Sequence, residues 1–195
     1  MRKLVSFMHI SLDGFTTNSK GQMDWIVADE EMFEIAGQQT LKSDTALYGR
    51  GTYKIMEDYW PTAADQPNAT KHDIEHSAWY KSVQKIVVSK TLKSSEVKNA
   101  EVISENLPDE IRKLKEGDGK EIVMFGSPTL TRSLMNENLI DEYWLFINPI
   151  LLGQGNNLFK NLSHEIKLKL LMSKTFTSGV VCFHYETKRT IKFNY

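Results

Sequence analysis

The sequence has little of what stabilises secreted or membrane-spanning proteins. Cys182 is the one cysteine among 195 residues, so no intrachain disulfide and no cysteine-clustered metal site can form, which fits a reducing compartment. No apolar run approaches the roughly 18 residues of a membrane-spanning helix. The first ten residues carry two cations and an apolar stretch, but His9 interrupts it and no small-residue cleavage site follows. We therefore predict a first β-strand there, not a signal peptide, and a cytoplasmic protein.

A large excess of charge of either sign is also absent. Lys and Arg total 24 and Asp and Glu total 25, whereas a protein that mainly binds nucleic acid needs a basic surface. Hydrophobic residues make up 41% and charged residues 25%, which excludes disordered, coiled-coil and collagen-like chains. The composition predicts a globular protein that binds neither nucleic acid nor a membrane. It leaves room for a local basic pocket that holds one small anion.

Segments typical of strands alternate with segments typical of helices. We expect strands at 4–10, 45–48, 85–89, 101–104, 121–125 and 142–150. We expect helices at 29–41, 52–59, 108–115 and 129–138. Two further strands, 167–176 and 180–188, flank a Thr-Ser-Gly turn and predict a C-terminal antiparallel hairpin. The pattern predicts an α/β fold, a mostly parallel mixed sheet with helices on both faces, in one domain that spans residues 1–195.

The segment 60–77 is rich in Pro, Ala, Asp and Asn and is too long for a plain connection, so we predict a functional flap or a mobile insertion. His72 and His76 are four residues apart, a spacing that zinc sites use, but no third ligand is evident and a surface helix is the favoured interpretation. For His9 we favour a buried, hydrogen-bonded histidine over one that lines a ligand cleft.

Three junctions share one design: a buried strand, then small residues, then the start of a helix. They lie at 47–52, 87–91 and 124–129. Glycine lets a ligand approach the backbone, and the unpaired N–H groups at a helix start attract an anion. Two junctions add a cation, Arg50 or Lys90, and each adds a hydroxyl, from Thr52, Ser89 or Thr129. Together the junctions can hold a polyphosphate with an extra phosphate at one end.

Neither common nucleotide motif is present. No Gly-x-Gly-x-x-Gly opens a helix, and there is no Gly-x-x-x-x-Gly-Lys-Ser/Thr loop. A nucleotide-binding fold must therefore belong to another family.

The motifs, taken in order, resemble the dihydrofolate-reductase-like fold. They are Ser-Leu-Asp-Gly at 11–14, Gly-Arg-Gly-Thr-Tyr at 49–53, Ile-Val-Val-Ser-Lys at 86–90 and Gly-Ser-Pro-Thr-Leu at 126–130. Leu-Ile-Asp-Glu at 139–142 and the Pro-Ile-Leu-Leu-Gly-Gln-Gly run at 149–155 are similar to the reductase domain of the bifunctional riboflavin-biosynthesis deaminase/reductase. The resemblance covers essentially the whole chain and implies a three-layer sandwich.

The resemblance also implies that NADPH is the cofactor. In that family the equivalent turns hold the pyrophosphate and the adenosine 2′-phosphate. The positions that match are Gly49, Arg50, Gly51, Thr52, Ser89, Lys90, Gly126, Ser127, Pro128, Thr129 and Leu130. Trp25 matches a tryptophan of the loop that covers the nicotinamide. The charges agree, because Arg and Lys beside a 2′-phosphate dianion favour NADPH over NADH.

On the substrate side the family pattern is broken. Thr40 stands where riboflavin reductases have an arginine for the ribose phosphate, and Phe125 stands where they have a glutamate. Phe33 lies near the position of the pterin-binding carboxylate of dihydrofolate reductases. Phe33 and Phe125 are therefore candidate substrate-binding residues.

Hydride transfer also needs a proton source. The candidate catalytic residues are Glu34, which is otherwise a solvated helix residue, and Asp13, which is otherwise a turn residue.

We expect an NADPH-dependent reductase of a small heterocyclic or carbonyl compound. The family implies 5-amino-6-(5-phosphoribosylamino)uracil, and because the family often dimerises we expect a homodimer. Two alternatives stay open: a non-catalytic NADP(H)-binding sensor, and a dihydrofolate reductase, against which the missing helix carboxylate counts.

Overall fold

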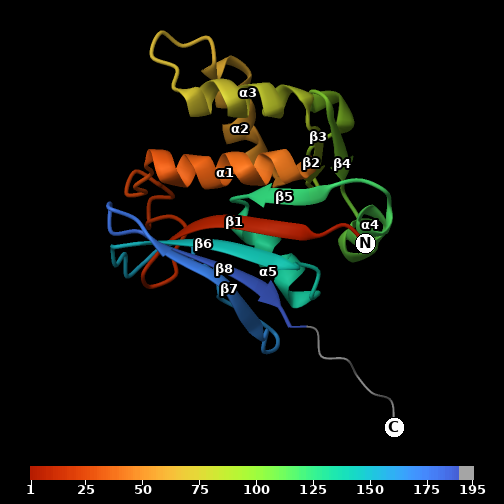
Figure 1. The fold of residues 1–195 in the computed structure, drawn as a ribbon. Coiled ribbons are helices and arrows are strands. Elements are labelled where there is room, and N and C mark those ends of the chain that lie inside the picture. The colour runs from red at the N-terminus through yellow and green to blue at the C-terminus, as the bar shows by residue number, and fades with distance from the viewer. Residues whose placement is uncertain (189–195) are drawn as a thin grey trace.

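The chain forms one eight-stranded sheet with helices on both faces (Figure 1). The structure, a computed structural model, describes residues 1–188, and the part of the expected domain at 189–195 lies outside the described residues. The strand order is β4-β3-β2-β5-β1-β6-β8-β7. Strands β1 to β6 pair in parallel, and β7 and β8 form the antiparallel pair at one edge, as the sequence predicted.

Each predicted strand and helix is present, with ends shifted by a few residues. The strands are β1 (Leu4–Ser11), β2 (Ser43–Gly49), β3 (Gln84–Val88), β4 (Ala100–Ile103), β5 (Glu121–Phe125), β6 (Glu142–Asn148), β7 (Leu168–Thr175) and β8 (Val181–Thr187). The helices are α1 (Glu30–Lys42), α2 (Arg50–Ala63), α3 (Lys71–Ser82), α4 (Leu107–Glu116) and α5 (Pro128–Asn136). None of the helices within residues 1–188 has the length and apolarity to cross a membrane.

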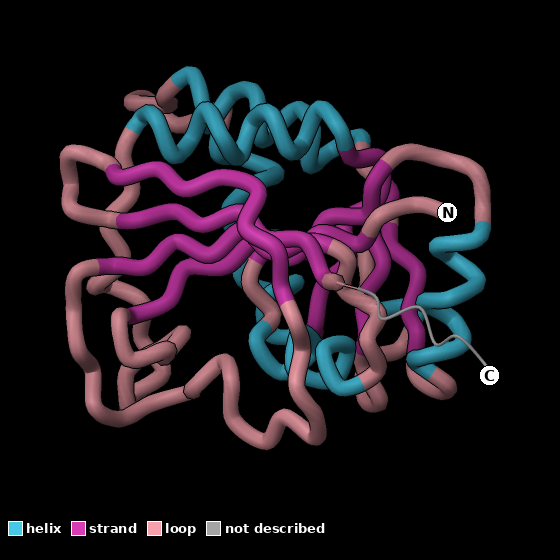
Figure 2. The backbone as a smooth tube through the Cα atoms, turned by 60° about the horizontal axis from the view of Figure 1, so that its bottom comes forward, coloured by secondary structure: helices cyan, strands magenta, loops and turns pink. Residues whose placement is uncertain are grey.

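The sheet separates two hydrophobic clusters, because successive side chains of a strand point to opposite faces. Along β5, Ile122 and Met124 join one cluster with residues of α4 and α5. Val123 and Phe125 join the other cluster with residues of α1, α2 and α3. The helices therefore cover the two faces, and Figure 2 shows them on either side of the strands. The predicted three-layer sandwich is confirmed.

The prediction of a flap at 60–77 was wrong. Helix α2 continues through Pro61 to Ala63, and α3 begins at Lys71, so most of the segment is helical. A proline in the last turn of a helix costs less than one in its middle, because few residues follow it. The Thr70 hydroxyl accepts a hydrogen bond from the Asp73 N–H (3.2 Å), and the Asp73 carboxylate accepts one from the Thr70 N–H (2.9 Å). This capping box was visible in the sequence and fixes the start of α3.

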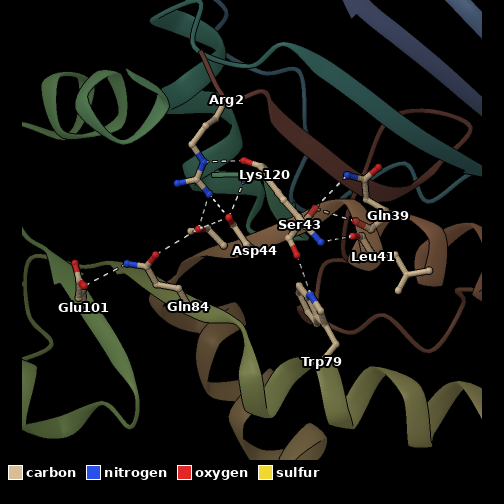
Figure 3. Close-up of polar contacts among 10 residues, drawn as sticks. Arg2, Gln39, Leu41, Ser43, Asp44, Trp79, Gln84, Glu101 and Lys120 are labelled. Carbon is tan, nitrogen blue, oxygen red and sulfur yellow. Dashed lines mark hydrogen bonds and ion pairs between the residues drawn. The ribbon is translucent and has the colours of Figure 1, made fainter. Parts of the chain in front are cut away.

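A polar network ties the chain start to the amino ends of the central strands (Figure 3). The guanidinium of Arg2 is paired with Asp44 and donates to the Thr45 hydroxyl (2.7 Å) and to the Lys120 carbonyl (2.7 Å). The Lys120 N–H donates to Asp44 (2.7 Å). The network lies at the end of the sheet where β2 and β5 begin, which leaves their carboxyl ends for the site.

Candidate functional site

A cleft of about 1180 Å³ lies at the carboxyl ends of the parallel strands. Its walls come from the end of β1, from the β2–α2 and β5–α5 junctions, and from the segments that follow β3 and β4. Helices α1 and α3 and the loop between β1 and α1 supply the remaining wall. Open α/β sheets bind their ligands at this edge.

The β2 and β5 junctions are bonded to each other. The Gly49 N–H donates to the Ser127 hydroxyl (3.0 Å), and the Ser127 N–H donates to the Thr52 hydroxyl (3.0 Å). Gly126 has φ +64, and a Cβ there would lie 3.4 Å from the Thr52 methyl. A side chain at Gly126 would thus add backbone strain, and its Cβ would contact the other junction. The junctions meet because β2 pairs directly with β5 and with β3.

Two helix starts and two cations line the cleft near the β2–α2 and β5–α5 junctions. Neither α2 nor α5 has a side-chain cap or an acidic residue in its first turn, so the positive end of each helix dipole is not neutralised. Arg50 and Lys90 both line the cleft, and the Arg50 guanidinium donates to the Thr91 hydroxyl (2.6 Å). We call this part of the cleft, at Gly49–Thr52, Lys90 and Gly126–Leu130, the basic end. Its chemistry suits a polyphosphate.

The residues expected to bind the cofactor line the cleft, except for two. Ser89 is buried, and its hydroxyl accepts from the N–H groups of Thr91 (3.2 Å) and Leu92 (3.0 Å), so it shapes the turn before Lys90. Trp25 is half-buried in the loop between β1 and α1, and its indole N–H donates to the Gln22 carbonyl (3.2 Å).

Neither candidate catalytic carboxylate is among the residues that line the cleft. Asp13 accepts from the Ser11 hydroxyl (2.6 Å) and from the N–H groups of Leu152 (3.1 Å) and Gly153 (2.7 Å), and the Ser11 bond lowers its pKa. Asp13 thus joins the loop after β1 to the loop at 152–153. Glu34 is exposed on α1. Thr40, also on α1, is buried away from the cleft, and its hydroxyl donates to the Gly37 carbonyl (2.7 Å).

Another part of the cleft is aromatic. Phe33 stacks on His72 with ring centroids 4.2 Å apart, and His76 packs against Trp60 at 3.9 Å and against Phe125 at 5.5 Å. All five residues line the cleft, and we call this part, at Phe33, Trp60, His72, His76 and Phe125, the aromatic end. Both candidate substrate-binding residues, Phe33 and Phe125, lie here.

His72 and His76 lie on a helix, as predicted, but the surface position was wrong for His76, whereas His72 is half-buried. The His76 side chain is buried, with 5% of the residue exposed, and burial lowers its pKa to about 3. The spacing alone predicted a shared helix face. It could not show that this face packs on Trp60 and Phe125, which come from other elements.

His9 also lines the cleft, contrary to the favoured interpretation, although it is largely buried as expected. Its ring stacks on Phe146 with centroids 4.8 Å apart and lies 3.5 Å from the buried amide of Asn148. The side-chain amide oxygen of Asn148 (Oδ1) accepts from the Val27 N–H (3.0 Å) and so ties the loop after β1 to the sheet. Burial lowers the pKa of His9 to about 4.

These two histidines predict a loss of stability in mild acid. In the unfolded chain both have a pKa near 6.5, so below that pH the unfolded state binds more protons than the folded state. The free energy of unfolding should therefore fall as the pH drops from 6.5, until about pH 4 for His9 and about pH 3 for His76. At pH 5 each should cost about 2 kcal/mol relative to pH 7.

Urea unfolding at pH 7 and pH 5 measures this loss. The variant His76→Gln should lose less stability between the two pH values than the wild type. His164→Gln, at an exposed position, is the control and should behave as the wild type. An equal pH dependence in all three proteins would contradict the burial of a neutral His76.

Comparisons with known proteins agree with the fold. The model of the RibD C-terminal domain family matches residues 2–182. The chain is 33% identical over 187 residues to the uncharacterized protein YyaP of Bacillus subtilis, an alignment that covers 94% of each.

Two solved structures share the fold at low sequence identity. One is the diaminohydroxyphosphoribosylaminopyrimidine deaminase/5-amino-6-(5-phosphoribosylamino)uracil reductase of Thermotoga maritima (TM-score 0.67, 14% identity), which matches 96% of this chain and 57% of its own. The other is the dihydrofolate reductase of Enterococcus faecalis in complex with NADP(H) (TM-score 0.65, 12% identity), which matches 96% of this chain and 97% of its own. The fold is thus dihydrofolate-reductase-like, and the match over residues 2–182 shows that the chain belongs to the RibD C-terminal domain family.

Proposed function

We propose that the protein is an NADPH-dependent reductase that transfers a hydride to a small heterocyclic or carbonyl compound. One observation carries the proposal: a single cleft joins a basic end, with two uncapped helix starts, to an aromatic end. The first suits the phosphates of a dinucleotide and the second suits a flat acceptor. The cleft is also larger than the roughly 300–1,000 Å³ of a typical small-molecule site, which leaves room for two molecules.

The residues of the basic end fit the phosphates of NADPH. Gly126, with φ +64, carries no side chain, which lets a phosphate approach the N–H groups at the start of α5. Arg50 and Lys90 would pair with the 2′-phosphate, the group that distinguishes NADPH from NADH. The NADP(H)-bound dihydrofolate reductase with the same fold supports this cofactor.

The bound cofactor and the residues that line the cleft would have different roles in the reaction. Bound NADPH supplies the hydride. The aromatic end excludes water and orients the acceptor, and the loop that Asn148 holds through the Val27 N–H covers one side. Asp13 and Glu34 do not line the cleft, so the proton that completes the reduction would come from solvent or from one of the lining carboxylates, Glu105 or Glu137.

Fluorescence titration of the protein with NADPH and with NADH tests the cofactor. We expect NADPH to bind at least about tenfold more tightly, because one charge-assisted hydrogen bond contributes roughly 1.5–3 kcal/mol. Equal affinity for the two would contradict the assignment of Arg50 and Lys90.

Absorbance at the NADPH band tests turnover. We expect NADPH to be oxidised in the presence of at least one member of a panel of pyrimidines, pterins and quinones, which includes 5-amino-6-(5-phosphoribosylamino)uracil and dihydrofolate. Tight NADPH binding without oxidation by any of them would favour the sensor over the enzyme.

A further inference from the structure

His76 is a buried polar group without a partner. It is 5% exposed, and neither of its ring nitrogens has a hydrogen-bond partner among the described residues. An unsatisfied buried donor or acceptor costs roughly 1–3 kcal/mol, and buried polar groups are therefore nearly always paired. A pairing that residues 1–188 do not provide can come from a ligand or from water.

Aromatic rings surround His76 on its other sides, so a partner for its nitrogens would have to come from the cleft. Trp60 packs against the ring at 3.9 Å, and Trp79 and Phe125 contact it edge-on at 5.1 and 5.5 Å. The faces of these rings accept at most a weak N–H···π contact, and no conventional hydrogen bond to the imidazole nitrogens comes from the described residues. His76 lines the cleft, and because its two ring nitrogens are covered by their neighbours, a molecule in the aromatic end would reach them once these rings shift.

The charges of the cleft limit what that molecule can carry. The cations among its described lining residues are Arg50 and Lys90, and both belong to the basic end. Burial lowers the pKa of His72 and of His76, so both imidazoles are neutral at pH 7. A phosphate in the aromatic end would lie without a cation, which is costly away from water.

We propose that His76 hydrogen-bonds the acceptor, and that the acceptor is a flat, uncharged ring with a carbonyl or ring nitrogen and without a phosphate. The inference rests on the proposed reductase function and names its class of substrate. A neutral imidazole offers one N–H donor and one lone pair, which match a carbonyl oxygen or a ring N–H. Phe33 and His72, stacked at 4.2 Å, line the same end and add flat surface for the ring.

The reaction balances with the two molecules that the cleft would hold. The hydride adds to the carbon of a C=O or C=N bond, whose π pair moves to the heteroatom. The heteroatom then takes a proton from water. NADPH becomes NADP⁺, and the acceptor gains two electrons. His76 keeps its own proton and acts by binding and orienting the acceptor.

The direct test observes the His76 ring nitrogens by NMR in the NADP⁺-saturated protein. The probes are lumazine, menadione and 5-amino-6-(ribosylamino)uracil. We expect at least one of them to bind and to shift the His76 nitrogen resonances, while those of the exposed His164 stay unchanged. Failure of all three to bind below millimolar concentration, or binding without a shift at His76, would overturn the inference.

Two further measurements test the inference: one uses a variant of His76, and the other compares a ligand with its phosphorylated form. His76→Phe keeps the ring and removes both nitrogens, so the probe should bind at least about tenfold more weakly, as expected for one lost hydrogen bond, while NADP⁺ affinity is unchanged. The uracil compound should bind no more weakly than its 5′-phosphate. Tighter binding of the phosphate by tenfold or more would contradict the proposed class. If His76→Phe does not fold, the wild-type NMR shifts still decide.

Failure of the inference and failure of the proposed function can be told apart. If NADPH binds but no probe contacts His76, the inference alone fails. If NADPH does not bind, the reductase proposal fails, whatever the probes do.

Discussion

Replacing both Arg50 and Lys90 by alanine is expected to weaken NADPH binding by about 10- to 100-fold and to leave NADH binding within about twofold. A hydrogen bond to a charged group contributes roughly 1.5–3 kcal/mol, which is about 10- to 150-fold in affinity. Both side chains are exposed in the free protein, so solvent screening places the effect of each below the upper limit. The preference for NADPH over NADH should therefore be lost, because NADH lacks the phosphate that the two cations contact.

Isothermal titration with each cofactor measures the effect. Lys54→Ala is the matched control: it removes an exposed cation from the same helix, α2, at a position that does not line the cleft. It should change neither affinity. A double variant that loses NADPH and NADH affinity equally would show that Arg50 and Lys90 act on a shared part of the two cofactors, and the 2′-phosphate would have to bind elsewhere.

Asp141→Ala is expected to destabilise the protein by about 3–5 kcal/mol, the usual cost of removing one partner from a buried ion pair. Asp141 is paired with the Lys115 ammonium, which is 1% exposed, at 2.5 Å. The same ammonium donates to the Leu139 carbonyl (2.8 Å), and the Asp141 carboxylate also accepts from the Leu4 N–H (2.8 Å). The variant would remove the Asp141 carboxylate from beside a buried cation and from the Leu4 N–H of β1.

Urea unfolding at pH 7 measures this loss. Asp109→Ala, which removes an exposed ion pair with Arg112, should cost less than about 1 kcal/mol and serves as the control. An Asp141→Ala protein as stable as the control would contradict the structural role. NADPH affinity should be unchanged in both variants, because Asp141 and Asp109 do not line the cleft.

Asp141 also shows that a family motif can have a structural role. It belongs to the Leu-Ile-Asp-Glu motif that carried part of the resemblance to riboflavin reductases. In the structure, Asp141 precedes β6, and its neighbour Glu142 accepts from Lys3 (2.5 Å) and is bonded to His184 (2.8 Å), which lowers the Glu142 pKa to about 2. The motif fastens β6 to β1, β8 and α4, at the end of the sheet away from the cleft.

The sequence was sufficient for the strands and for helices α1, α2, α4 and α5, and for their order, but not for α3. Runs such as 85–89 and 121–125 predicted strands buried on both faces, and the glycines after β2 and β5 predicted helix starts with free N–H groups. These features depend on residues close together in the chain, so periodicity and turn chemistry reveal them. The cations Arg50 and Lys90 follow the same logic, because each lies directly after a predicted strand.

The tertiary structure decided which side chains share the cleft. The strand order puts β2 between β3 and β5, which brings three junctions from distant parts of the chain to one place. It also turns Asp13 toward the 152–153 backbone and leaves Glu34 on the outer face of α1, so neither candidate proton donor reaches the cleft. His76 is buried because α3 packs against Trp60 of α2 and Phe125 of β5. Burial and pairing across elements depend on contacts between residues that are far apart in sequence, which no local pattern encodes.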